Sequence, residues 1–162
     1  MASNLTDLGV AAIRDGFRSG VFSAREVAEA FNANVAGAKA LNAFIVETPE
    51  HALAAADQAD KDRAAGALRP LSGVPIGMKD LFATKGVQTT AASHILEGFT
   101  PPYESTVSQK LWDAGAGMLG KLNMDQFAMG SSNETSYFGN VISPGKRNDG
   151  GNAALAPGGS SG

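Results

Sequence analysis

The sequence contains no cysteine and only two histidines, His51 and His94. The absence of thiols excludes disulfides, a thiolate nucleophile and cysteine-ligated zinc or iron–sulfur centres. We expect no metal site in this chain. Catalysis would therefore have to use serine, lysine, aspartate, glutamate or tyrosine.

Long apolar runs and an excess of basic residues are also missing. The longest apolar run has five residues (52–56), far short of the roughly 20 that cross a bilayer. Charged residues interrupt the first twenty positions and leave no room for a secretory signal, so we expect a cytoplasmic protein. With 13 basic and 16 acidic residues the net charge is -3, which gives no electrostatic footprint for nucleic acid.

The first 66 residues are expected to form a helical segment. Apolar residues at helical spacing predict a helix over 5–17, ended by Gly20, and a second over 23–37, opened by the capping box of Ser23 and Glu26. Residues 44–46 predict a short strand. Thr48 before Pro49 then predicts a capped helix start, followed by an alanine-rich stretch to about residue 65.

From residue 67 onward glycine becomes frequent and short apolar runs alternate with turns. The pattern predicts strands over 74–78 and 116–119, a helix over 107–114 and a short helix over 124–129, which together favour an α/β architecture. The sequence stops at Gly162 inside a glycine-rich loop, a type of loop that flanking elements normally hold. We therefore expect 67–162 to be the incomplete first part of a larger core.

One spacing matches a nucleotide-binding motif formally. Gly115, Gly117 and Gly120 have the Gly-x-Gly-x-x-Gly spacing, but that fingerprint requires a strand before it and a helix after it. Here a helix is predicted before it and a strand after it, so we interpret Gly115 as the end of the helix. The chain also has no phosphate-binding loop, and we expect it to bind no ATP.

Lys79 closes an apolar run and directly precedes Asp80. Burial at a strand end could keep its amine neutral and make it a proton acceptor, which requires lowering its pKa by roughly 3 units, or about 4 kcal/mol. The alternative is a lysine whose stem covers the core while its ammonium reaches water or pairs with Asp80.

Ser160 and Ser161 lie in a Gly-Gly-Ser-Ser-Gly loop, where the lack of bulky side chains lets backbone N–H groups approach a substrate. The alternative is a flexible linker. A serine needs a base within reach to act as a nucleophile, and neither histidine has the neighbours of a Ser-His-Asp triad. Lysine is the remaining base.

The chain resembles the amidase signature family in three stretches: GVPIGMKD at 73–80, GAGMLGKLN at 115–123 and APGGSSG at 156–162. This resemblance implies an α/β/α fold with a large mixed sheet and a Ser, cis-Ser, Lys triad. Lys79 matches the lysine and Ser160 the bridging serine. Family members carry the nucleophilic serine about two dozen residues further on, beyond Gly162, so we expect the fragment itself to be inactive.

Within that family, the stretch MDQFAMGSS at 124–132 resembles the A subunits of tRNA-dependent amidotransferases. The resemblance implies that the enzyme releases ammonia from glutamine, with Met129, Gly130 and Ser131 lining the amide pocket. It also implies partner B and C subunits, of which B would bind ATP, magnesium and most of the misacylated Glu-tRNA or Asp-tRNA. Two alternatives stay open: a general amidase of small amides, and a non-catalytic assembly module.

Overall fold

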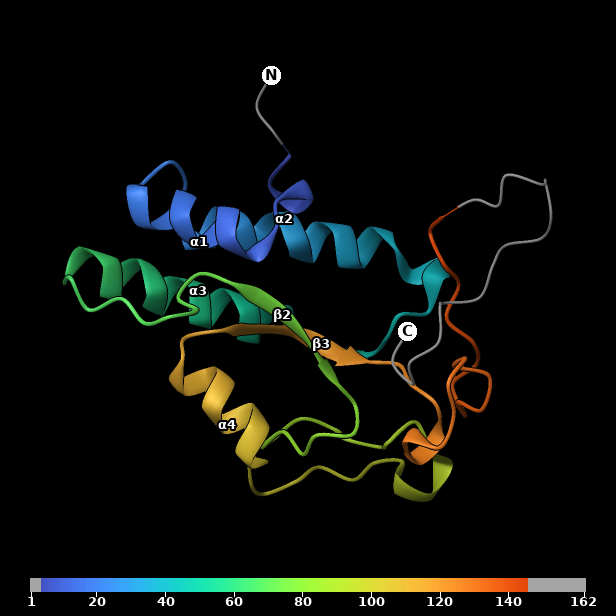
Figure 1. Ribbon diagram of the computed structural model, residues 1–162. Coiled ribbons are helices and arrows are strands. Elements are labelled where there is room, and N and C mark those ends of the chain that lie inside the picture. The colour runs from blue at the N-terminus through green and yellow to red at the C-terminus, as the bar shows by residue number, and fades with distance from the viewer. Residues whose placement is uncertain (1–3, 146–162) are drawn as a thin grey trace. The chain divides into compact units, whose positions relative to one another are not determined.

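The computed structural model describes residues 4–145. Its helices are α1 (Val10–Ser19), α2 (Ala24–Gly37), α3 (Pro49–Ala64) and α4 (Thr106–Asp113), and its strands are β1 (Phe44–Glu47), β2 (Pro75–Lys79) and β3 (Gly117–Leu122) (Figure 1). Short 3-10 turns occupy Leu5–Asp7, Lys39–Leu41, His94–Leu96 and Gln126–Ala128. Across the described range, no helix has both the length and the apolar character needed to cross a membrane.

The described residues fall into two compact units. Unit 1 comprises the chain up to Gly37 together with Thr48–Gly77 and Gln109–Leu119. Unit 2 comprises Ala38–Glu47, Met78–Ser108 and the chain from Gly120 onward. The domain boundary that we expect at residue 66, between the helical segment and the first part of the core, stays a prediction.

The strands form a mixed sheet in the order β1-β3-β2. β1 pairs antiparallel with β3 and is bulged between Phe44 and Val46. The other pair is parallel, because Gly117 N–H donates to Val74 O near one end and Asp80 N–H donates to Leu122 O at the other. The expected α/β class is therefore confirmed.

The first helix is shorter than its apolar spacing predicts. Residues 5–7 form a separate 3-10 turn, in which the Asn4 side chain accepts a hydrogen bond from Thr6 N–H, and α1 begins at Val10 after Gly9. Its end is confirmed, since Gly20 takes the left-handed conformation with φ 76° and donates back to Phe17 O.

The capping box at the start of α2 is confirmed. Glu26 N–H donates to Ser23 Oγ at 3.0 Å, and Ser23 N–H donates to the Glu26 carboxylate at 2.7 Å. The two intervening amides, those of Ala24 and Arg25, donate to the Asp60 carboxylate of α3 at 3.0 and 3.2 Å. A side chain distant in sequence thus satisfies helix-end donors that local residues leave open.

Thr48 precedes α3 as expected, but its hydroxyl does not cap the helix. It donates instead to Met118 O at 3.0 Å, while Thr48 N–H donates to Leu119 O. The hydroxyl therefore attaches the start of α3 to β3 within unit 1.

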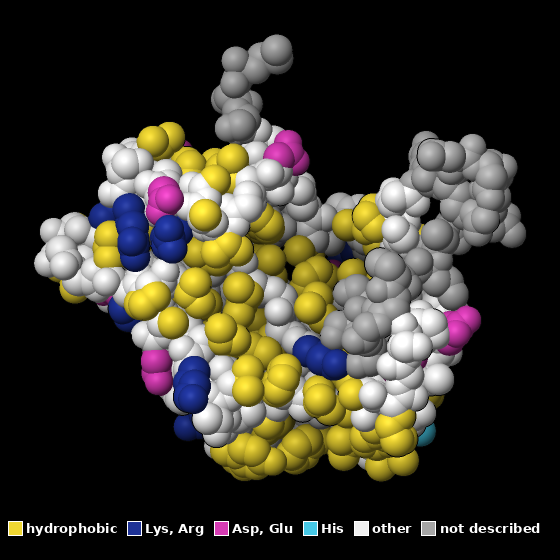
Figure 2. Space-filling model, in the orientation of Figure 1, with side chains coloured by type: hydrophobic (Ala, Val, Ile, Leu, Met, Phe, Trp, Pro, Cys, Tyr) yellow, Lys and Arg dark blue, Asp and Glu magenta, His cyan; other side chains and the backbone are white. Residues whose placement is uncertain are grey.

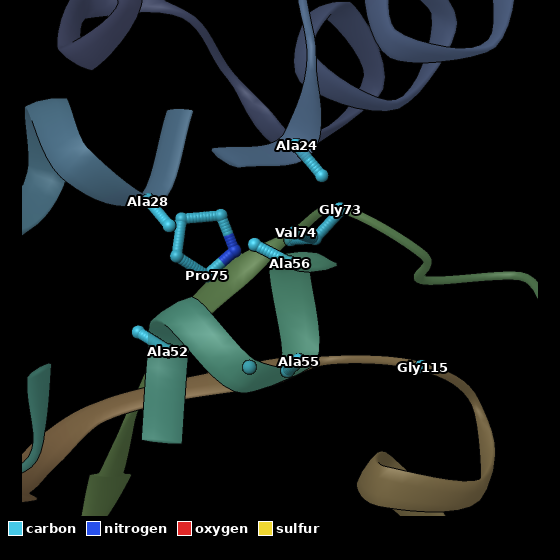
Figure 3. Close-up of a pocket in the computed structure, with 10 residues that line it drawn as sticks. Ala24, Ala28, Ala52, Ala55, Ala56, Gly73, Val74, Pro75 and Gly115 are labelled. Carbon is cyan, nitrogen blue, oxygen red and sulfur yellow. The ribbon is translucent and has the colours of Figure 1, made fainter. Parts of the chain in front are cut away.

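Alanine lets α2 and α3 pack closely. Figure 3 shows alanine side chains of the two helices facing the segment that leads into β2. These residues line a cavity of about 10 Å³. The cavity is hardly large enough for one water molecule and has an apolar lining, so it is a packing gap. Its lining residues are Ala24, Ala28, Ala52, Ala55, Ala56, Gly73, Val74, Pro75, Gly115 and Gly117.

Larger apolar side chains also remain at the surface. Figure 2 shows apolar side chains among the surface atoms. Ile95 and Met129 of unit 2 are 77% and 75% exposed, and Tyr103 and Tyr137 are more than half exposed. Single exposed apolar side chains are common on protein surfaces, so these four residues do not by themselves define a binding surface.

Candidate active site

Lys79 is the last residue of β2 and is half-buried. Sequence reasoning considered Asp80 as its ion-pair partner, but the structure gives Asp80 a different one. The Asp80 carboxylate faces the Lys121 ammonium, with 3.8 Å between Oδ1 and Nζ, and both side chains are fully buried. The buried charge pair of this region is therefore Lys121 and Asp80.

Lys121 has a complete set of hydrogen-bond acceptors. Its Nζ donates to Phe82 O at 2.6 Å, to Thr89 Oγ1 at 2.8 Å and to Thr84 Oγ1 at 3.1 Å. Burial lowers the pKa of this amine to about 8, although the negative charges of Asp80 and Glu104 act in the opposite direction. Through these three hydrogen bonds Lys121 stabilises the segment that follows β2.

Sequence reasoning missed this role of Lys121. The residue lies in β3, where every position from Gly117 to Lys121 is buried. A lysine inside a run of apolar residues and glycines is a sequence signal for a buried, paired charge, because an unpaired ammonium is too costly to bury. That signal is visible in GMLGKL.

Asp80 uses its second carboxylate oxygen to hold a loop. Oδ2 accepts hydrogen bonds from Thr90 Oγ1 at 2.6 Å, Thr90 N–H at 3.0 Å and Ala92 N–H at 3.2 Å. Ala91 and Ala92 adopt positive φ angles of 50° and 54°, which residues with a Cβ rarely adopt. The carboxylate therefore stabilises a strained backbone turn.

The short helix expected over 124–129 is wrong in extent. Only Gln126–Ala128 forms a 3-10 turn, and Phe127 and Ala128 within it have φ values of 51° and 60°. The chain reverses there because the Asp125 carboxylate accepts from Asn133 N–H, Thr135 N–H and the Thr135 hydroxyl at 2.9 to 3.2 Å. Those bonds close a loop instead of extending a helix.

Asp125 is buried, which by itself raises the pKa of its carboxyl. The hydrogen bonds from Asn133, Thr135 and Ser132 together outweigh burial, so the net result is a pKa below the usual 3.8. Gly130 lies against this carboxylate, since a Cβ placed on it would stand 2.6 Å from Asp125 Oδ1. The loop therefore requires both an ionised carboxylate at Asp125 and a residue without a Cβ at Gly130.

The loop closed by Asp125 presents the three residues expected to line an amide pocket. Met129, Gly130 and Ser131 are all exposed at its tip. Contact with a substrate stays a prediction for all three. Ser160 and Ser161 lie outside the described residues, so the expected approach of Lys79 to Ser160 also stays a prediction.

Neither histidine forms part of this arrangement. His51, expected on a solvated helix face, is half-buried in unit 1, where its Nδ1 accepts from Met118 N–H at 3.2 Å and its ring lies 5.0 Å from that of Trp112. His94 is exposed, stacks on Tyr137 and lies 2.6 Å from Glu97. Within residues 4–145, no group of three or more histidines and carboxylates could hold a metal ion.

Comparison with known proteins shows the family to which the chain belongs. The family described as Amidase matches residues 26–162, and the chain belongs to this family. The A subunit of the glutamyl-tRNA(Gln) amidotransferase of Sphingopyxis alaskensis is 83% identical over 98% of this chain and 32% of its own length. The corresponding protein of Zymomonas mobilis is 65% identical over 99% of the chain and 32% of its own length. The chain thus spans about a third of the length of these curated relatives.

Solved structures agree on the fold. An inhibitor-bound chain from a vestigial protein complex, described as revealing the origins of an s-triazine catabolic enzyme, superposes with a TM-score of 0.83. It is 37% identical over 94% of this chain and 33% of its own. Native peptide amidase from Stenotrophomonas maltophilia has a TM-score of 0.70, with 29% identity over 85% of this chain and 28% of its own. The expected amidase-signature fold is confirmed for this part of the protein.

Proposed function

We propose that the protein to which this chain belongs hydrolyses glutamine and supplies the ammonia for transamidation of misacylated Glu-tRNA(Gln) or Asp-tRNA(Asn). The observation that carries the proposal is the 83% identity, over 98% of the chain, to the A subunit of a glutamyl-tRNA(Gln) amidotransferase. This identity supports the inference that the segments holding Lys79 and the 126–135 loop serve the same kind of enzyme.

In the proposed mechanism Lys79 is the general base. It takes a proton from the Ser160 hydroxyl, which takes one from a nucleophilic serine beyond Gly162 as that serine attacks the glutamine carboxamide. Ser160 then donates a proton to the leaving nitrogen and recovers one from Lys79, so that ammonia departs. Water then hydrolyses the acyl-enzyme to glutamate. Met129, Gly130 and Ser131 would contact the amide substrate from the exposed loop tip.

The remaining steps are assigned to partners. B and C subunits complete the complex, and the B subunit holds ATP, magnesium and most of the tRNA. The net charge of -3 supports this division, because an acidic chain does not attract a polyanion. We place the complex in the cytoplasm, where tRNA is charged.

The test is ammonia release from glutamine by the full-length protein, alone and with its B and C partners. Lys79→Met should abolish activity, whereas the matched control Lys85→Met, which alters an exposed lysine of the same unit, should retain it. Glutamine hydrolysis that survives Lys79→Met would refute the mechanism.

The alternatives give different results in the same assays. A general amidase would hydrolyse small amides at least as fast as glutamine and would not co-purify with B and C subunits. An assembly module would release no ammonia from any amide. The fragment 1–162, which lacks the proposed nucleophile, should be inactive and poorly soluble because β1 and β2 are the edge strands of its described sheet.

A further inference from the structure

Asp80 connects the strand end that carries Lys79 with the turn at residues 90–92, both in unit 2. On one side it directly follows Lys79, and its own N–H donates to Leu122 O of β3. On the other side its Oδ2 holds Thr90 and Ala92 by three hydrogen bonds. The strand end that carries Lys79 and the 90–92 turn are therefore attached to the same side chain.

The 90–92 turn in turn holds the loop that carries Met129, Gly130 and Ser131. Ala91 O accepts from Phe127 N–H at 2.9 Å, and Ala92 O accepts from Tyr137 N–H at 3.0 Å. These two bonds lie on either side of the loop tip, so they fix where the tip begins and where it ends. Gln126 adds a third link through its side-chain amide, which donates to Ser93 Oγ at 2.7 Å.

The conformation of the turn explains why a carboxylate is needed. Ala91 and Ala92 both have positive φ angles, an arrangement that persists only when the surroundings hold it in place. In this conformation the N–H groups of Thr90 and Ala92 converge on one acceptor, while the two alanine carbonyls face the substrate loop. An ionised oxygen is the strongest acceptor available for such convergent donors.

Resting on the proposed function, we propose that Asp80 is a positioning residue that sets the substrate loop at 129–131 in register with Lys79 through the 90–92 turn. Lys121 supports the arrangement from the other side, since it faces Asp80 Oδ1 and binds Phe82 O and Thr84 and Thr89 in the intervening segment. Asp80 itself is fully buried and acts through the turn.

The decisive variant is Thr90→Val in the full-length protein, which keeps the side-chain shape and removes the 2.6 Å hydrogen bond to Asp80. The matched control is Ser108→Ala. Ser108 is also fully buried in unit 2, and its hydroxyl donates to the Glu104 carboxylate and lies 3.0 Å from Ala83 O, but it is bonded neither to Asp80 nor to either loop. The two variants therefore remove comparable buried hydroxyls, only one of which belongs to the proposed link.

For Thr90→Val we expect the KM for glutamine to rise about tenfold, with kcat reduced less than about twofold, because the loop that binds substrate shifts while Lys79 stays in place. Ser108→Ala should leave KM unchanged. Thr90→Ser keeps the hydroxyl and should have a KM close to that of the wild type. If Thr90→Val does not fold, Thr90→Ser still tests the proposal. A raised KM in Thr90→Ser would show that the methyl group matters and not the hydrogen bond, and it would overturn the proposal.

Amide hydrogen exchange separates this inference from the proposed function. Exchange over residues 126–137 should be faster in Thr90→Val, or in Asp80→Asn, than in Ser108→Ala. If the wild type hydrolyses glutamine but Thr90→Val and Ser108→Ala share its KM, the positioning role is refuted while the function stands. If the wild type releases no ammonia, the proposed function fails, and equal exchange in the variants would refute the link through Asp80 as well.

Discussion

Removing the Lys121 ammonium by Lys121→Met leaves the Asp80 charge unpaired in a site closed to solvent. The acceptors that Lys121 used keep other partners, because Thr84 Oγ1 also donates to Phe82 O and Thr89 Oγ1 to Val87 O, both at 3.2 Å. The cost of the substitution therefore falls mainly on the carboxylate. Breaking a buried pair in this way typically costs about 3 to 5 kcal/mol of unfolding free energy. The substitution also removes an ammonium that burial disfavours, which offsets part of this cost, so we expect a net loss of about 1 to 2 kcal/mol near pH 7.

The double variant Lys121→Met with Asp80→Asn removes both charges. The asparagine introduced by Asp80→Asn would still offer one oxygen to the three donors of Thr90 and Ala92. Replacing a whole buried pair is often close to neutral, so the double variant should be more stable than Lys121→Met alone by about 2 kcal/mol or more. That coupling distinguishes an ion pair from two independent packing contacts.

The same pair makes stability depend on pH in a defined window. Burial lowers the pKa of Lys121 to about 8 in the folded protein, against 10.5 for an ordinary lysine. Between these values the unfolded chain binds more protons than the folded one, so the free energy of unfolding should rise as pH increases from 8 to 10.5. The full gain approaches about 3 kcal/mol above pH 10.5 and is absent below pH 8.

The assay is urea unfolding of the full-length protein, followed by circular dichroism at several pH values between about 7 and 10.5, for the wild type and Lys121→Met. Subtracting the unfolding free energy of Lys121→Met from that of the wild type cancels the contributions of the other groups that titrate in this range. A difference that stays constant with pH would refute the depressed pKa of Lys121. Strictly additive effects of Lys121→Met and Asp80→Asn would refute the ion pair.

Three further predictions concern local contacts. Gly120→Ala should lower the urea-unfolding free energy by about 2 kcal/mol, because a Cβ there overlaps the backbone of β1. Gly37→Ala, in open space at the end of α2, should not lower it, because alanine favours a helix more than glycine does; equal effects would contradict this. Ser23→Ala should cost about 1 kcal/mol in the same assay, and no change would mean that the capping box contributes nothing. Gly130→Ala should displace the Asp125 carboxylate and raise the KM for glutamine severalfold, while an unchanged KM would separate that carboxylate from substrate binding.

Much of the fold could be predicted because local rules governed it. The capping box of Ser23, the left-handed Gly20 and the position of α4 follow from residue preferences within a few positions of each other. The rejection of the glycine motif also holds, since β3 begins at Gly117 and α4 precedes it. Gly120 is small because β1 passes directly beside it, not because a phosphate needs the space.

The predictions from sequence were wrong where a side chain forms hydrogen bonds with backbone groups far away in the sequence. The hydroxyl of Thr48 donates to Met118 O instead of capping α3, since β3 lies within its reach. The 124–129 helix is replaced by a loop because the Asp125 carboxylate gathers donors from Asn133 and Thr135. Local propensity cannot anticipate hydrogen-bond partners that arrive from eight to seventy residues away.

By itself the sequence determined the class of the chain and the position of its candidate lysine. Lys79 stands at a strand end because an apolar run must finish where a charged side chain can reach solvent or a partner. Only the tertiary structure decided which charges are buried together. Asp80 is adjacent to Lys79 in sequence but faces Lys121, 41 positions further along, because parallel pairing of β2 with β3 brings those two side chains into the same closed interior. A buried charge requires an opposite charge and hydrogen-bond donors at fixed distances, and such distances exist only in the folded chain.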